Sequence, residues 1–102
     1  MVKKIMLMCS GGMSTSLLVT KMKKVATATG YDAEIAAYGC SDAESVVAQH
    51  QPDVLLLGPQ VRYLYNELST KLDLPVGVIN TMDYGMMDGE KVLKQAQTLL
   101  SK

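Results

Sequence analysis

Short apolar runs alternate along the chain with longer stretches in which apolar residues recur every three or four positions. A continuous apolar run of about four to eight residues is typical of a strand covered on both faces, and the longer period is typical of an amphipathic helix. The runs predict strands over 2–8, 32–38, 54–57 and 76–79. The amphipathic stretches predict helices over 14–29, 41–51, 60–71 and from 88 to the end of the sequence.

Polar and conformationally special residues mark the ends of these elements. Gly30 is placed to end the first helix, because glycine readily takes the left-handed conformation found after many helices. Ser41-Asp42-Ala43-Glu44 has the spacing of a capping box, which predicts the start of the second helix. Pro52 ends that helix. The stretch 80–87 reads as a loop, with Asp88 as the N-cap of the last helix.

The alternation of strands and helices predicts an α/β three-layer sandwich with a four-stranded parallel sheet. Right-handed crossovers and helices on both faces favour the flavodoxin-like strand order 2-1-3-4. Ligands of such folds bind at the carboxyl edge of the sheet, beside the point where the strand order reverses. That point lies next to the first strand. The chain is long enough for one domain with its own core, and we expect residues 1–102 to form it.

One loop at that edge carries candidate chemistry, because a buried strand, two glycines and a helix N-terminus meet at a cysteine. A helix start offers unpaired N–H groups and partial positive charge, which suit an anion and favour the nucleophilic thiolate form of cysteine. The glycines allow close backbone approach, and the hydroxyl groups can donate to phosphate oxygens. We therefore predict a cysteine that carries a phosphoryl group, within a phosphate loop. The residues are Cys9, Ser10, Gly11, Gly12, Met13, Ser14, Thr15 and Ser16.

Composition excludes several other classes of function. Ten basic residues balance ten acidic ones, so the charge gives no sign of nucleic-acid binding. No apolar run approaches the roughly 20 residues that span a bilayer, and we expect a cytoplasmic protein without direct membrane insertion. Two cysteines and one histidine do not make a zinc cluster, so we expect no metal and no cofactor. We interpret Cys40 as a small buried hydrophobe and His50 as a solvated or capping residue.

The loop also carries a resemblance to a known family. Cys9-Ser10-Gly11-Gly12-Met13-Ser14-Thr15-Ser16-Leu17-Leu18-Val19 closely resembles the start of enzyme IIB of the lactose/cellobiose (chitobiose) class. These proteins are components of the bacterial phosphoenolpyruvate-dependent sugar phosphotransferase system. Two further stretches match, Leu56-Leu57-Gly58-Pro59-Gln60-Val61 and Tyr84-Gly85 followed by Asp88-Gly89. The resemblance covers the whole chain in length and in the order of its elements.

The resemblance implies a phosphotransferase that works between two protein partners. In that family a phosphohistidine of the IIA protein donates a phosphoryl group to the IIB cysteine, which passes it to a sugar imported by the membrane permease IIC. Carried over, Cys9 is the phosphocysteine and Ser10 to Ser16 form its phosphate loop. Pro59, Gln60 and Tyr84 are implied to border that loop. The implied substrate is a β-linked disaccharide such as cellobiose, chitobiose or lactose.

Two alternatives of other classes fit the same fold. A low-molecular-weight tyrosine phosphatase also has a cysteine loop after its first strand, but it needs an arginine six residues after the cysteine to clamp the phosphoryl group. That position is Thr15, and the only arginine is Arg62. An arsenate reductase needs further cysteines, and a nucleotide-binding P-loop needs Gly-Lys-Ser/Thr. A non-catalytic flavodoxin-like interaction module is the other alternative, and it would not take up phosphate on Cys9.

Overall fold

Strands and helices alternate in the computed structural model, which describes residues 2–9, 13–39 and 42–101. The parallel strands are β1 (Lys3–Cys9), β2 (Ala33–Gly39), β3 (Val54–Leu57) and β4 (Val76–Val78). The α-helices are α1 (Met13–Thr29), α2 (Ala43–His50), α3 (Tyr65–Lys71), α4 (Thr81–Gly85) and α5 (Gly89–Leu100). A 3₁₀ helix, η1 (Pro59–Leu64), precedes α3.

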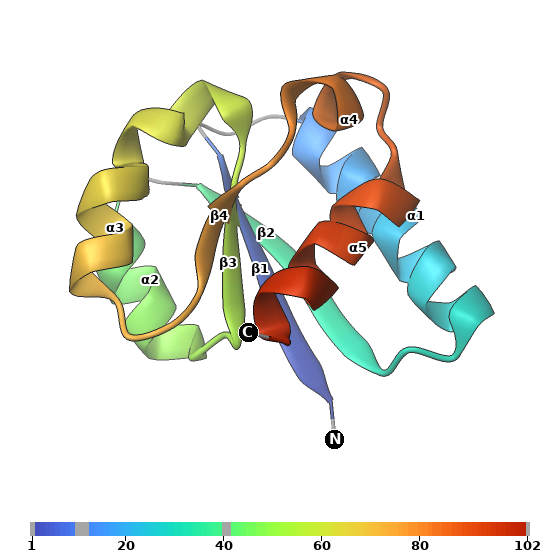
Figure 1. Cartoon of the computed structure of the whole chain (residues 1–102), viewed down its shortest axis with the longest axis horizontal. Helices are drawn as coiled ribbons and strands as arrows, with labels where there is room; N and C mark the ends of the chain where they lie inside the picture. Colours follow the sequence, from blue (N-terminus) through green and yellow to red (C-terminus); the bar gives the residue numbers. More distant parts are fainter. Residues whose placement is uncertain (1, 10–12, 40–41, 102) are drawn as a thin grey trace.

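The four strands form one sheet in the order β2-β1-β3-β4, which confirms the predicted flavodoxin-like order. At the centre of the sheet, Ile5 of β1 pairs with Ile35 of β2 on one side and with Val54 of β3 on the other. Helices α1, α4 and α5 cover one face, and α2, η1 and α3 cover the other (Figure 1). The result is the predicted three-layer sandwich, with every strand running toward the same edge.

The core has two halves because successive side chains of a strand point to opposite faces of the sheet. Ile5 and Leu7 of β1 pack in the half that contains α1 and α5, and Met6 and Met8 pack in the half that contains α2, η1 and α3. Burying each such side chain stabilises the fold by about 1.5–3 kcal/mol. The buried apolar positions of α1 and α5 recur at helical spacing, and the buried apolar positions on the helices include Leu18, Met22, Ala26, Val61, Leu68, Val92, Leu93 and Ala96.

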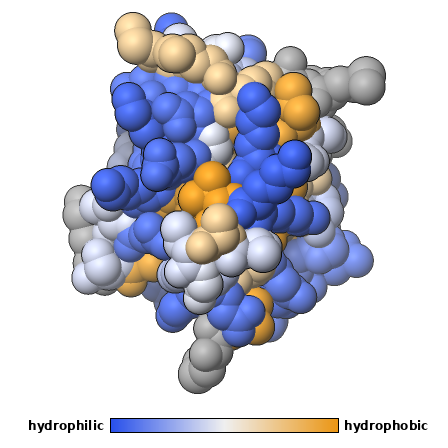
Figure 2. All heavy atoms as spheres, turned by 90° about the vertical axis from the view of Figure 1, so that its right-hand side faces the viewer, coloured by the Kyte–Doolittle hydropathy of each residue, from blue (hydrophilic) through white to orange (hydrophobic). Residues whose placement is uncertain are grey.

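Helix α5 packs closely against α1 at its first residue, Gly89. A Cβ atom built on Gly89 would lie 2.7 Å from the carbonyl carbon of Lys21 and 2.8 Å from the backbone nitrogen of Met22. Only a residue without a side chain allows this approach of the two backbones. Hydrophilic side chains cover most of the outer face that α1 and α5 present, and hydrophobic side chains gather near its centre and at its upper end (Figure 2).

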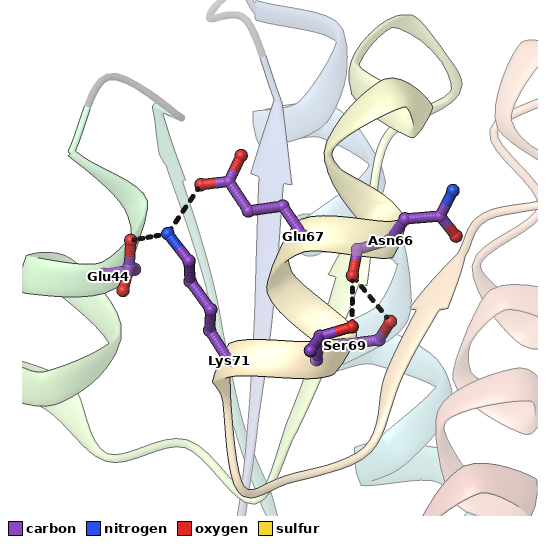
Figure 3. Close-up of polar contacts among 6 residues, drawn as sticks. Glu44, Asn66, Glu67, Ser69 and Lys71 are labelled. Atoms are coloured by element: carbon purple, nitrogen blue, oxygen red, sulfur yellow. Dashed lines mark hydrogen bonds and ion pairs between the residues drawn. The ribbon is translucent and has the colours of Figure 1, made fainter.

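A pair of ion contacts involves α2 and α3, which cover the other face of the sheet. The ammonium group of Lys71, at the end of α3, lies 3.5 Å from a carboxylate oxygen of Glu44 in α2 and 3.4 Å from one of Glu67 in α3 (Figure 3). Glu44 first, and Glu67 second, raise the pKa of Lys71 above its ordinary value, because both negative charges favour the protonated amine. All three side chains are about half exposed, so solvent and salt screen the interaction.

The predicted elements were wrong in two places. The helix expected over 60–71 begins as η1 and becomes α-helical only at Tyr65, since Val61 has non-helical backbone angles (φ −118°, ψ 23°). The loop expected over 80–87 contains α4, whose first turn is capped by the side chain of Asn80. The predicted capping residue Ser41 lies outside the described residues, and Asp42 stands at the N-cap of α2.

Candidate functional site

Cys9 ends β1 at the carboxyl edge of the sheet and is almost fully buried, with 4 % of its surface exposed. Helix α1 begins at Met13, so the strand and the helix N-terminus lie on either side of the predicted phosphate loop. Ser10, Gly11 and Gly12 lie outside the described residues, as do the side chains of Met13 and Ser14 and the whole of Cys40. Ser16 is exposed on α1. The junction expected from the sequence is therefore present at Cys9.

The hydroxyl group of Thr15 is a polar group that the structure places against the sulfur. Thr15 Oγ1 donates a hydrogen bond to Cys9 Sγ at 3.0 Å, and it lies 2.9 Å from the phenol oxygen of Tyr84. Thr15 and Tyr84 expose only 2 % and 8 % of their surfaces. A hydroxyl group that donates to sulfur can stabilise negative charge that develops on it during a reaction.

Tyr84 reaches this position from the short helix α4, after strand β4. The side-chain oxygen of Asn80 accepts hydrogen bonds from the backbone N–H groups of Met82 at 2.9 Å and Asp83 at 3.2 Å. The N–H of Tyr84 donates to the carbonyl of Asn80 at 2.9 Å, which completes the turn. The aromatic ring packs into the half of the core that contains α1 and α5. These contacts hold the phenol group in one place.

The segment after β3 forms the other wall of the site. The N–H of Gly58 donates to the carbonyl of Met8 at 2.8 Å, and a Cβ atom built on Gly58 would lie 3.4 Å from the Cβ of Cys9. The start of η1 is therefore packed directly beside the cysteine. The side-chain oxygen of Gln60 folds back over the same glycine, 3.2 Å from that Cβ position.

A hollow of about 710 Å³ opens between η1 and α4. The three residues implied to border the loop, Pro59, Gln60 and Tyr84, all line it. The other lining residues are Arg62, Tyr63, Thr81, Gly85 and Met87, and of these Arg62 and Tyr63 were not expected at the site from the sequence. Arg62 brings a positive charge to the hollow. Its place just after β3, at the binding edge of a parallel sheet, was the signal that could have identified it.

Large apolar side chains are exposed on η1, α4 and the start of α1. Met82 and Met86 of α4 expose 72 % and 70 % of their surfaces, and Tyr63 of η1 exposes 72 %. Leu17, in the first turns of α1, is half exposed. Exposed methionine and tyrosine side chains are common on surfaces that bind other proteins. The edge that holds Cys9 therefore has the character of a docking surface as well as of an anion site.

A larger hollow, of about 870 Å³, follows the edge strand β2 and lies away from Cys9. His50 lines it together with Lys4, whose ammonium group donates to the His50 carbonyl at 3.2 Å. The His50 ring stacks on Tyr38 with a centroid separation of 4.5 Å. His50 thus lies near the start of β1, at the opposite end of the sheet from Cys9, and is half-buried against an aromatic ring. The smaller hollow is the one connected to Cys9, because Tyr84 lines it and contacts the Thr15 hydroxyl that donates to the Cys9 sulfur.

Within 2–9, 13–39 and 42–101, no three His, Cys, Asp or Glu side chains are grouped so that they could hold a metal ion. None of the helices in these ranges is both long and apolar enough to cross a membrane.

Comparisons with known proteins agree with this geometry. Residues 4–95 match the family model of the phosphotransferase system lactose/cellobiose-specific IIB subunit. The chain is 47 % identical to a galactose-specific EIIB component of Lactococcus lactis subsp. cremoris, over 97 % of each chain. It is 48 % identical to an oligo-beta-mannoside-specific EIIB component of Bacillus subtilis, over 96 % of each chain.

Solved structures give the same result. The cellobiose-specific IIB component of Borrelia burgdorferi superposes with a TM-score of 0.81 at 36 % identity, covering 99 % of this chain and 94 % of that one. The lactose-specific IIB domain of Streptococcus pneumoniae also has a TM-score of 0.81, at 19 % identity, which shows a shared fold. With the family match over most of its length, the chain belongs to the lactose/cellobiose-specific IIB family of the sugar phosphotransferase system.

Proposed function

We propose that this IIB component carries a phosphoryl group on Cys9, between a IIA donor protein and a sugar imported by a IIC permease. Residues 1–102 would act as a single carrier domain. One observation supports this most directly: Cys9 ends a strand at the mouth of α1, with the Thr15 hydroxyl donating to its sulfur at 3.0 Å. A cysteine at a helix mouth with a hydroxyl donor beside its sulfur is placed to act as a nucleophile toward phosphorus.

The proposed reaction has two displacement steps. In the first, the Cys9 thiolate attacks the phosphorus of a phosphohistidine in line; the S–P bond forms, the P–N bond breaks, and the histidine takes up a proton from solvent and leaves as neutral imidazole. In the second, a sugar hydroxyl oxygen attacks the same phosphorus. The O–P bond forms, the S–P bond breaks, the hydroxyl proton is released, and the Cys9 thiolate is restored. No cofactor, metal or nucleotide is needed, because backbone amides and hydroxyl groups of Ser10 to Ser16 would neutralise the phosphoryl oxygens.

The surroundings of Cys9 fit exchange with large partners. Pro59, Gln60 and Tyr84 would form the rim over which a partner reaches the sulfur, and exposed Met82 and Met86 would add apolar contact area. We propose that the protein works in the cytoplasm, associates with the membrane through IIC without inserting itself, and binds no nucleic acid. The substrate we favour is a β-linked disaccharide such as cellobiose, chitobiose or lactose. Relatives are named for galactose, cellobiose and oligo-beta-mannoside.

The test is reconstituted transfer with phosphoenolpyruvate, the general phosphotransferase proteins and candidate IIA partners, followed by mass spectrometry of the Cys9 peptide. We expect one phosphoryl group on Cys9. Cys9→Ser should remain folded by circular dichroism and lose transfer, because a serine hydroxyl there lacks a base to activate it. Cys40→Ser is the matched control and should stay within about tenfold of the wild type, or about 1.4 kcal/mol in the barrier. Transfer by folded Cys9→Ser would refute the assignment.

A further inference from the structure

We propose that Tyr84 is a positioning residue for Cys9 and acts on the sulfur through the hydroxyl group of Thr15. The three polar atoms form a chain: Tyr84 OH lies 2.9 Å from Thr15 Oγ1, which lies 3.0 Å from Cys9 Sγ. The residues are far apart in the sequence, and α4 and α1 bring them together. The catalytic meaning of this chain rests on the proposed function, but its effect on the thiol does not.

Counting protons fixes the direction of the chain. A threonine hydroxyl has one proton, and Thr15 gives it to the sulfur of Cys9. Thr15 Oγ1 can then only accept from Tyr84, so the phenol is the donor in the second hydrogen bond. Both protons point toward the sulfur. Consecutive hydrogen bonds in one direction polarise each other, so the phenol strengthens the donation from Thr15 to Cys9.

Burial makes the tyrosine necessary rather than merely helpful. Only 2 % of the Thr15 surface is exposed, so water cannot readily replace a lost hydrogen-bond partner of its hydroxyl group. Without the phenol, the hydroxyl proton of Thr15 would still have the sulfur, but its oxygen would lack a donor. The hydroxyl would then be held by one hydrogen bond instead of two. The phenol therefore orients Thr15 as well as polarising it, and α4 exists as a small platform that holds the phenol there.

The hydrogen-bonded chain from Tyr84 to Cys9 would also act throughout the proposed cycle. As the Cys9 sulfur attacks, the Thr15 hydroxyl donates to it and the Tyr84 phenol donates in turn to Thr15. After transfer, the charge resides on the phosphoryl oxygens bound to the same sulfur, and a hydroxyl donor beside them remains favourable. The chain has no carboxylate or imidazole among its members, so it supplies no general base for attack by water. Tyr84 would thus support a carrier rather than a hydrolase.

The test is the rate at which iodoacetamide alkylates Cys9 at neutral pH, a reaction that needs no phosphoryl donor. The variants are Tyr84→Phe, Thr15→Val, their double mutant and Thr15→Ser, and the matched control is Tyr38→Phe, which removes a phenol bound to His50 instead. Mass spectrometry separates the Cys9 peptide from that of Cys40, which serves as an internal reference. A failed phosphoryl transfer would count against the proposed function. Alkylation would still report on the hydrogen-bonded chain from Tyr84 through Thr15 to Cys9.

We expect Tyr84→Phe to slow alkylation of Cys9 about threefold, since a smaller thiolate population outweighs the greater nucleophilicity of a less stabilised thiolate. Thr15→Val should slow it at least as much, and Thr15→Ser should restore it. The double mutant should match Thr15→Val, because Tyr84 acts only through Thr15. A faster reaction in Tyr84→Phe would mean that the tyrosine merely shields the site. An unchanged rate, or additive losses in the double mutant, would equally overturn the proposal.

Discussion

Replacing Gly89 with alanine should destabilise the protein by forcing α5 away from α1. The added methyl group would lie 2.7 Å and 2.8 Å from backbone atoms of Lys21 and Met22, which cannot turn aside as a side-chain end can. Overpacking of this kind costs about 1–3 kcal/mol. Alanine recovers up to about 1 kcal/mol of that, because it restricts the unfolded chain more than glycine does. We therefore expect a net loss of up to about 2 kcal/mol in the free energy of unfolding.

For a domain of this size such a loss lowers the thermal midpoint by up to roughly 10 °C. Thermal and urea unfolding followed by circular dichroism would measure it. The matched control is Gly85→Ala in α4, where an added Cβ meets nothing within 4 Å. The control should leave the midpoint unchanged or raise it slightly. If Gly89→Ala were as stable as that control, the close approach of the two backbones would not be a constraint, and our account of α1 against α5 would be wrong.

Two further effects on stability follow from caps and charges. Asn80→Ala should lower the free energy of unfolding by about 1 kcal/mol, because it removes the side chain that caps α4. Asn66→Ala is the control and should change the free energy of unfolding little, because the hydrogen bond at Asn66 is made by its backbone carbonyl, which alanine keeps. Glu44 and Glu67 raise the pKa of Lys71, so their stabilising contribution is complete below the ordinary lysine value of 10.5 and disappears as the pH rises through the raised value. In thermal melts, Lys71→Gln should therefore differ from the wild type only slightly at neutral pH, and not at all in concentrated salt or at high pH.

The sheet and its core could be predicted because their signals are local and periodic. The apolar runs of β1 and β3 have no polar position facing either side, which requires helices on both faces of the sheet. The inward positions of α1 and α5 follow from the helical repeat alone. Strand order then follows from general rules of handedness and connection.

Parts of the site could not be predicted, because they depend on contacts between distant residues. Helix α4 is too short to show a helical repeat, and it forms because the Asn80 side chain caps it. The 3₁₀ start of η1 depends on Pro59 and on the bent backbone at Val61. The sequence indicated that Thr15 could donate to a phosphate, but not that its hydroxyl would link Cys9 to Tyr84 across the domain.

The central claim is that Cys9 holds a phosphoryl group for transfer rather than releasing it to water. A phosphatase of similar fold uses an arginine where this chain has Thr15, and the arginine stabilises the transition state of release. The decisive measurement is the decay of purified phosphoprotein alone, beside its decay after the permease and sugar are added. We predict that the phosphoprotein persists alone and discharges when the acceptor arrives, with negligible hydrolysis of p-nitrophenyl phosphate by the unmodified protein. Decay as fast without acceptor as with it would contradict the account and make Cys9 the nucleophile of a hydrolase.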